Sequence, residues 1–133
     1  MIVVDTSVLI DFFRGDPTPG ADRLRQIEIG EVPFAVPAIC AQEVLQGAAD
    51  EGEWSTIRRL LETQRLATPE DPCATHLAAA RIYYDCRRQG ITVRSGVDCF
   101  IAQLVLERGD VLLHSDADFE RIRRVRPLQT LTE

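Results

Sequence analysis

Three short apolar runs, each followed by a segment of helical periodicity, constrain the fold of this chain more than any other feature. They cover residues 2–4, 34–36 and 111–113. Short continuous apolar runs are typical of strands that are buried on both faces. Because they alternate with helical segments, the sequence predicts an α/β fold with a parallel sheet between layers of helices. A chain of 133 residues fits one domain, residues 1–133.

The segments between the runs are expected to be helices, because their apolar residues recur at helical spacing. The expected helices cover residues 21–29, 53–64, 73–89, 97–107 and 118–124, with one more from the N-cap Thr6 or Ser7 to Arg14 and another that starts near residue 38. In the longest of these, Leu77, Ala80 and Tyr84 share one face. Residues 66–68 and 127–131 are further candidate strands, and the second is expected at a sheet edge because it starts with proline.

Composition excludes several functions. All 15 basic residues are arginine, and a net charge of −6 argues against a large non-specific nucleic-acid surface. Phosphatases of the haloacid dehalogenase type need a lysine and a second aspartate where this chain has Ser7, and response-regulator receivers also need a lysine. The sequence has no Walker-type loop, no apolar run long enough to cross a bilayer and no signal peptide, so we expect a cytoplasmic protein.

The cysteines and histidines are predicted to have structural roles. The cysteines lack the spacing of zinc ligands and are expected to be small buried residues in a reducing compartment. They are Cys40, Cys73, Cys86 and Cys99. His76 and His114 do not lie where a catalytic triad would need a base, so Ser7 and Ser115 are not predicted to be nucleophiles.

Five acidic residues follow separate strands or begin separate helices. They are Asp5, Glu43, Asp98, Asp116 and Asp118. In a parallel α/β sheet these positions share one edge, where the carboxylates would repel each other unless a cation bound them. Oxygen ligands favour Mg²⁺ or Mn²⁺, and such an ion supports hydrolysis of phosphodiesters. Each acid alone could equally cap a helix or complement its dipole, but the joint pattern favours a metal site.

Four segments, in this order and at this spacing, resemble the PIN-domain ribonucleases. They are the runs at residues 3–10 (VVDTSVLI), 37–43, 98–102 (DCFIA) and 115–119 (SDADF). Within that family, the chain is most similar to the VapC-type toxins of toxin–antitoxin pairs. The resemblance extends over essentially the whole chain.

The resemblance implies a three-layer α/β/α fold with about five parallel strands in the order 3-2-1-4-5. It implies that the metal-binding and catalytic residues are Asp5, Glu43, Asp98 and Asp116, with Asp118 as a further ligand. It also implies that Thr6, Ser7 and Ser115 orient water or ligands. Ser115 stands where the family often has threonine, which keeps the hydroxyl, and Phe100 replaces a smaller residue.

The expected substrate is RNA. Arg14 and Arg94 lie near the predicted active edge, where arginine can contact RNA phosphates. The resemblance further implies a small antitoxin whose flexible tail wraps the toxin, a homodimer and a hetero-oligomer of the two proteins. A binding groove or dimer face is expected near Trp54, Leu60, Tyr83 and Tyr84, and core packing is the competing role for these side chains.

Two other functions remain open from the sequence. One is a PIN-like scaffold that binds RNA or protein without cutting it, and the other is a PIN nuclease that processes RNA without being a toxin. The complete set of acids favours an enzyme, because a scaffold has no reason to keep mutually repelling carboxylates together.

Overall fold

A parallel sheet of four strands forms the centre of the computed structural model, which describes residues 1–131. The strands are β1 (Ile2–Val4), β2 (Phe34–Pro37), β3 (Arg65–Ala67) and β4 (Val111–Leu113), in the order β3-β2-β1-β4. Val3 of β1 pairs with Ala35 on one side and with Leu112 on the other. The predicted parallel sheet is confirmed, and its first four strands have the predicted order.

The predicted fifth strand is a single bridge instead of a strand. Leu112 pairs in parallel with Thr130, and its backbone exchanges hydrogen bonds with Gln129 (2.9 Å) and Leu131 (2.7 Å). The segment therefore lies beside β4, where the order 3-2-1-4-5 places it. The neighbouring Val111 donates its backbone N–H to Met1, on the other side of β4.

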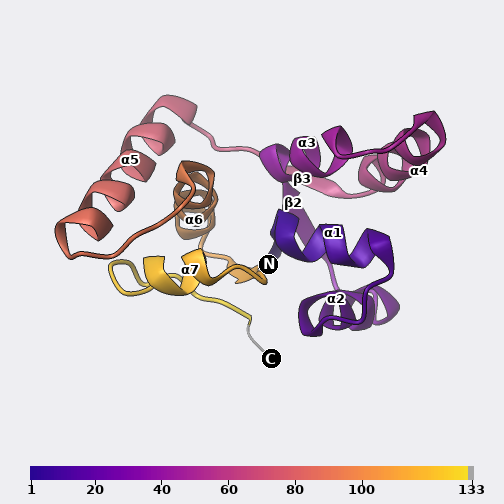
Figure 1. The fold of residues 1–133 in the computed structure, drawn as a ribbon, viewed down its shortest axis with the longest axis horizontal. Coiled ribbons are helices and arrows are strands. Elements are labelled where there is room, and N and C mark those ends of the chain that lie inside the picture. The colour runs from indigo at the N-terminus through magenta and orange to yellow at the C-terminus, as the bar shows by residue number, and fades with distance from the viewer. Residues whose placement is uncertain (132–133) are drawn as a thin grey trace.

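Seven helices cover the sheet in the described part of the chain, completing a three-layer α/β/α fold (Figure 1). They are α1 (Thr6–Arg14), α2 (Pro19–Ile29), α3 (Ala38–Gln46), α4 (Glu51–Glu62), α5 (Pro72–Arg88), α6 (Gly96–Arg108) and α7 (Ala117–Ile122). Figure 1 shows α1 and α2 on one side of the sheet and α5, α6 and α7 on the other. None of the helices in residues 1–131 is long and apolar enough to span a membrane.

Helix α6 occupies the middle of its layer, between the sheet and α5. Its buried residues point in several directions and include Ile101, Leu104 and Val105. Ser95 caps its start by accepting a hydrogen bond from the backbone N–H of Val97. Because the helix is surrounded by apolar side chains, Asp98 in its first turn is carried into the protein interior.

Helix α5 buries one face, which includes the large side chain of Ile82, and exposes other large side chains. Thr75, Ala79 and Cys86 are buried against the rest of the molecule, whereas Leu77 is 75% exposed. The face that Leu77 shares with Ala80 and Tyr84 is thus turned to solvent. The buried face thus mixes small residues with Ile82, so side-chain size alone does not identify it.

One prediction about burial is wrong, and one alternative is ruled out. Cys73 is exposed in the first turn of α5, although the other three cysteines are buried as expected. The four large apolar residues for which core packing was the competing role are all 39% exposed or more. They are Trp54, Leu60, Tyr83 and Tyr84.

Candidate active site

The end of β1 and the start of α1 place the first carboxylate. Asp5, not Thr6 or Ser7, is the N-cap of α1, and its side chain accepts a hydrogen bond from the backbone N–H of Ser7 (3.0 Å). Its own backbone N–H donates to the carbonyl of Leu113 (3.0 Å), which holds the ends of β1 and β4 together. Asp5 is only 3% exposed, and the Cys40 thiol donates a long hydrogen bond (3.8 Å) to its carboxylate.

Ser7 joins two of the predicted site segments. Its hydroxyl donates to the Asp5 carboxylate at 2.6 Å and accepts the backbone N–H of Ser115 at 3.0 Å. The first contact orients the carboxylate, and the second fixes the loop between β4 and α7 against the start of α1. Ser7 was predicted to orient ligands, and its contacts fit that role, whereas Ser115 enters the network through its backbone.

Glu43 is connected to the site through Thr6. The Thr6 hydroxyl donates to Oε1 of Glu43 at 2.8 Å, which links the first turn of α1 to α3. Glu43 is half-buried and lies on the side of α1 that faces α3 and α4. It therefore sits at the margin of the site, next to the capping residue Asp5.

Three further carboxylates converge from α6 and α7. Asp98, Asp116 and Asp118 each offer an oxygen, and these three atoms lie within 4.8 Å of one another. Asp116 is the N-cap of α7 and accepts the backbone N–H of Asp118 at 2.9 Å. The charge of Asp116 acts on both Asp5 and Asp98, so the two halves of the site face each other across the edge of the sheet.

Burial and mutual repulsion change the ionisation of these carboxyl groups. Burial raises the pKa of Asp98 to about 8, and the charges of Asp116 and Asp5 add to the effect. Burial also raises the pKa of Asp5, although hydrogen bonds from Ser7 oppose it. Burial disfavours ionised Asp118 too, but hydrogen bonds from Arg94, Asp98 and Arg121 outweigh it and lower its pKa. Without a cation, the carboxyl group of Asp98 therefore keeps its proton at neutral pH and donates a hydrogen bond to the ionised carboxylate of Asp118.

Of the two arginines predicted to contact RNA phosphates, the structure places one at the acidic cluster and the other away from it. Arg94 lies at the carboxylates: its side chain reaches Asp116 (3.3 Å) and Asp118 (3.6 Å), and its backbone N–H donates to Asp118 (3.0 Å). Its side chain is nevertheless 70% exposed and free to contact a ligand. Arg14 instead lies at the end of α1, in a cavity that Glu43 also lines.

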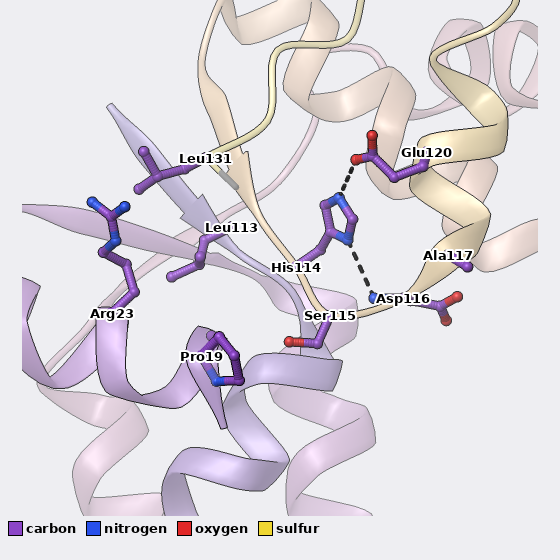
Figure 2. Close-up of a pocket in the computed structure, with 10 residues that line it drawn as sticks. Pro19, Arg23, Leu113, His114, Ser115, Asp116, Ala117, Glu120 and Leu131 are labelled. Atoms are coloured by element: carbon purple, nitrogen blue, oxygen red, sulfur yellow. Dashed lines mark hydrogen bonds and ion pairs between the residues drawn. The ribbon is translucent and has the colours of Figure 1, made fainter. Parts of the chain in front are cut away.

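His114 contacts both Asp116 and Glu120 (Figure 2), a role at this site that the sequence did not indicate. Its Nδ1 accepts the backbone N–H of Asp116 (3.2 Å), so its proton belongs on Nε2, which contacts Glu120 at 2.8 Å. The ring packs against Phe119, with 5.0 Å between ring centroids. His114 therefore has a structural role, as predicted, and the residue that it holds in place is Asp116. Only the proximity of His114 to Asp116 in the sequence could have suggested this.

The donor set fits a divalent cation. Asp98, Asp116 and Asp118 supply only oxygen atoms, the ligands that hard cations prefer, and Asp5 lies close enough for its charge to act on Asp98. The pKa of Asp98 is raised first by burial and then by the charges of Asp116 and Asp5, so ionising Asp98 without a cation is unfavourable. A divalent ion held by these residues would supply a compensating positive charge.

Comparison with known proteins identifies the family. A PIN-domain model matches residues 2–125. A VapC ribonuclease of Mycobacterium bovis and the ribonuclease VapC11 of Mycobacterium tuberculosis are each 36% identical over 132 residues, which is 97% of this chain and 96% of each relative. The chain therefore belongs to the PIN-domain family. Among PIN domains, its similarity is to the VapC ribonucleases, as the four sequence segments predicted.

Solved structures of toxin–antitoxin complexes share the fold. VapBC-1 of nontypeable Haemophilus influenzae superposes with a TM-score of 0.73 at 24% identity, over 98% of this chain and 97% of the matched chain. DNA-bound VapBC of Salmonella typhimurium gives a TM-score of 0.76 at 18% identity, over 98% of this chain and 96% of the other. These matches confirm the predicted PIN fold.

Proposed function

We propose that this chain is an endoribonuclease that hydrolyses RNA with Mg²⁺ or Mn²⁺ and is the toxin of a toxin–antitoxin pair. The observation that carries the proposal is the convergence of Asp98, Asp116 and Asp118 beside Asp5 at the carboxyl ends of the strands. The 36% identity to VapC ribonucleases, over nearly the whole of both chains, supports the activity and its target. An enzyme acting on cellular RNA belongs in the cytoplasm.

We assign the metal to the acidic cluster. We propose Asp98, Asp116 and Asp5 as its principal ligands and Asp118 as a further one. The oxygens of Asp98, Asp116 and Asp118 lie within 4.8 Å of one another, and the charge of Asp5 acts on Asp98. When bound, the ion supplies Lewis acidity that polarises the phosphodiester and lowers the pKa of a coordinated water. An ion that replaces the proton of Asp98 would balance the charges of Asp116 and Asp5, which add to the effect of burial on the pKa of Asp98.

The polar side chains around the cluster position the reacting groups. Ser7 fixes the orientation of Asp5 and the position of the Ser115 loop through its two hydrogen bonds. Glu43, held by Thr6 at the margin of the site, is placed to accept a proton from water. The guanidinium of Arg94 is 70% exposed beside the carboxylates and is placed to hold an RNA phosphate.

An antitoxin would bind the groove between α1, α3 and α4. This cavity, of about 300 Å³, is lined by Ile10, Phe13, Ile57 and Leu60, with Arg14 and Glu43 at its polar side. Apolar residues flanked by opposite charges suit an amphipathic segment of a partner protein. The resemblance to the chains of VapBC complexes supports such a partner. The exposed face of Leu77, Ala80 and Tyr84 on α5 is available for a second copy of the chain.

Cleavage of RNA by the purified, antitoxin-free protein tests the proposal. Discrete fragments should appear with Mg²⁺ or Mn²⁺ and disappear with EDTA or in the Asp98→Asn variant. Asp22→Asn is the matched control, because Asp22 is an exposed aspartate of α2 that pairs only with Arg25 among the described residues. A folded protein that leaves RNA intact with both ions would refute the nuclease and favour the scaffold.

A further inference from the structure

A cavity of about 530 Å³ opens between α5 and the start of α6, close to the acidic cluster. It is lined by His76, Ala79, Ala80, Tyr83, Arg94, Gly96 and Phe100. None of these lining residues is acidic, in contrast to the cavities that include Asp116 and Glu120 or Glu43 and Glu53. A smaller cavity that Arg94 also lines, together with Arg121 and Arg124, is free of acids as well but has no aromatic side chain among its lining residues. In the part of the chain that the structure describes, the larger cavity therefore offers a polyanion an approach to the carboxylates without repulsion from its own walls.

Aromatic rings from two helices form one wall of the cavity. The His76 ring of α5 stacks on Phe100 of α6, with 4.6 Å between ring centroids and 28° between planes. Phe100 is partly buried beneath, and His76 is exposed above it. Tyr83, two turns further along α5, adds a second exposed ring. The stack fixes the orientation of His76, so a flat ligand meets a surface that is already ordered.

Positive charge connects this wall to the proposed site of cleavage. Arg94 lines the cavity, and its guanidinium reaches Asp116 and Asp118 at 3.3 and 3.6 Å. The guanidinium of Arg87 lies 5.9 Å from the ring centroid of Tyr83 and puts a second positive charge beside it. A strand whose phosphate contacts Arg94 would therefore have one neighbouring base at the rings and its backbone at the carboxylates.

We propose that this cavity binds one unpaired nucleobase of the RNA substrate, stacked against His76, next to the phosphodiester that is cut. The inference rests on the proposed ribonuclease activity and adds the substrate contact that selects single-stranded RNA. Aromatic rings beside arginine match a base and its phosphate, and only an unpaired base is free to enter. A peptide segment of a protein partner is the competing occupant.

Kinetics and fluorescence with short RNAs test this binding site. The probes are oligoribonucleotides that carry 2-aminopurine at each position in turn, cleaved by the wild-type, His76→Ala, His76→Phe and Ala80→Glu proteins. His76 and Ala80 are both exposed, so these variants should fold. Cys73→Ala is the matched control, because Cys73 is an exposed residue of the same helix that does not line the cavity.

The expected result is a loss of substrate binding without a loss of chemistry. His76→Ala and Ala80→Glu should raise KM about tenfold with little change in kcat, since one stacked base contributes binding in both ground and transition states. His76→Phe should restore the wild-type KM, because it keeps the stacking ring. In wild-type protein, 2-aminopurine fluorescence should be quenched at one position only, and His76→Ala should abolish this quenching.

Unchanged KM values and quenching in all variants would overturn the proposal, while leaving the ribonuclease activity intact. A protein that fails to cut any RNA but still quenches the probe through His76 would contradict the proposed function and support base binding alone. Variants that lose affinity for the antitoxin but keep the KM for RNA would assign the cavity to the protein partner and overturn the inference.

Discussion

Replacing Asp98 with asparagine should make the metal-free protein less sensitive to pH. Burial and the charges of Asp116 and Asp5 raise the pKa of Asp98 from 3.8 to about 8. Between these values the folded protein holds a proton that the unfolded chain has released, so stability falls as pH rises. The slope is at most about 1.4 kcal/mol per pH unit, or nearly 3 kcal/mol between pH 5 and 7. Asparagine is neutral and can still donate a hydrogen bond to Asp118, so the variant lacks this loss.

Urea unfolding in EDTA at pH 5, 6 and 7 measures the effect. Between pH 5 and 7, the wild-type protein should lose about 2 to 3 kcal/mol more unfolding free energy than Asp98→Asn. Saturating Mn²⁺ should then stabilise the wild-type protein more than the variant, because the variant lacks a ligand. Parallel pH dependences in EDTA would refute the argument that Asp98 keeps a proton in the folded state.

Substitutions at three further residues test the contacts around the site. Ser7→Ala removes the link from Asp5 to the Ser115 backbone and should cost about 1–3 kcal/mol in urea unfolding, with reduced cleavage; an unchanged midpoint would contradict this. His114→Ala should weaken Mn²⁺ binding about tenfold by calorimetry, whereas His114→Asn, whose amide oxygen can accept the Asp116 N–H, should retain most of it; equal losses would contradict the positioning role. Gly20→Ala puts a Cβ 2.6 Å from Ser115 Oγ and 2.9 Å from a methyl group of Val8, and should lower the free energy of unfolding by about 1–3 kcal/mol. An unchanged melting temperature would contradict this and show that the Ser115 loop moves to make room for the Cβ.

The features of the fold that depend on local pattern could be predicted from the sequence. The apolar runs at residues 2–4, 34–36 and 111–113 are strands in parallel pairing, because a buried strand must be apolar over its whole length. The sequence predicted the start of α1 to within one or two residues, but it did not predict that Asp5 is the residue that caps the helix. Asp5, Thr6 and Ser7 are all good caps, and the choice between them depends on where the strand ends.

Features that depend on tertiary contacts could not be predicted. The face of α5 with Leu77 and Tyr84 is solvent-exposed because the helix packs through its other face, which carries Ala79, Ile82 and Cys86. Similarly, the sequence indicated that Asp98, Asp116 and Asp118 share a sheet edge, but not that Arg94 would pair with two of them. The contact of His114 with the Asp116 backbone was also hidden, because it depends on the course of the loop after β4.

Anomalous scattering from crystals soaked with Mn²⁺ tests the central claim most directly. We expect one or two strong peaks beside Asp5, within about 2.0–2.3 Å of carboxylate oxygens of Asp98 and Asp116. These peaks should be absent from Asp98→Asn crystals. A map without a peak among these carboxylates, from crystals that hold Mn²⁺ elsewhere, would contradict the assignment of this acidic cluster as the metal site of the nuclease.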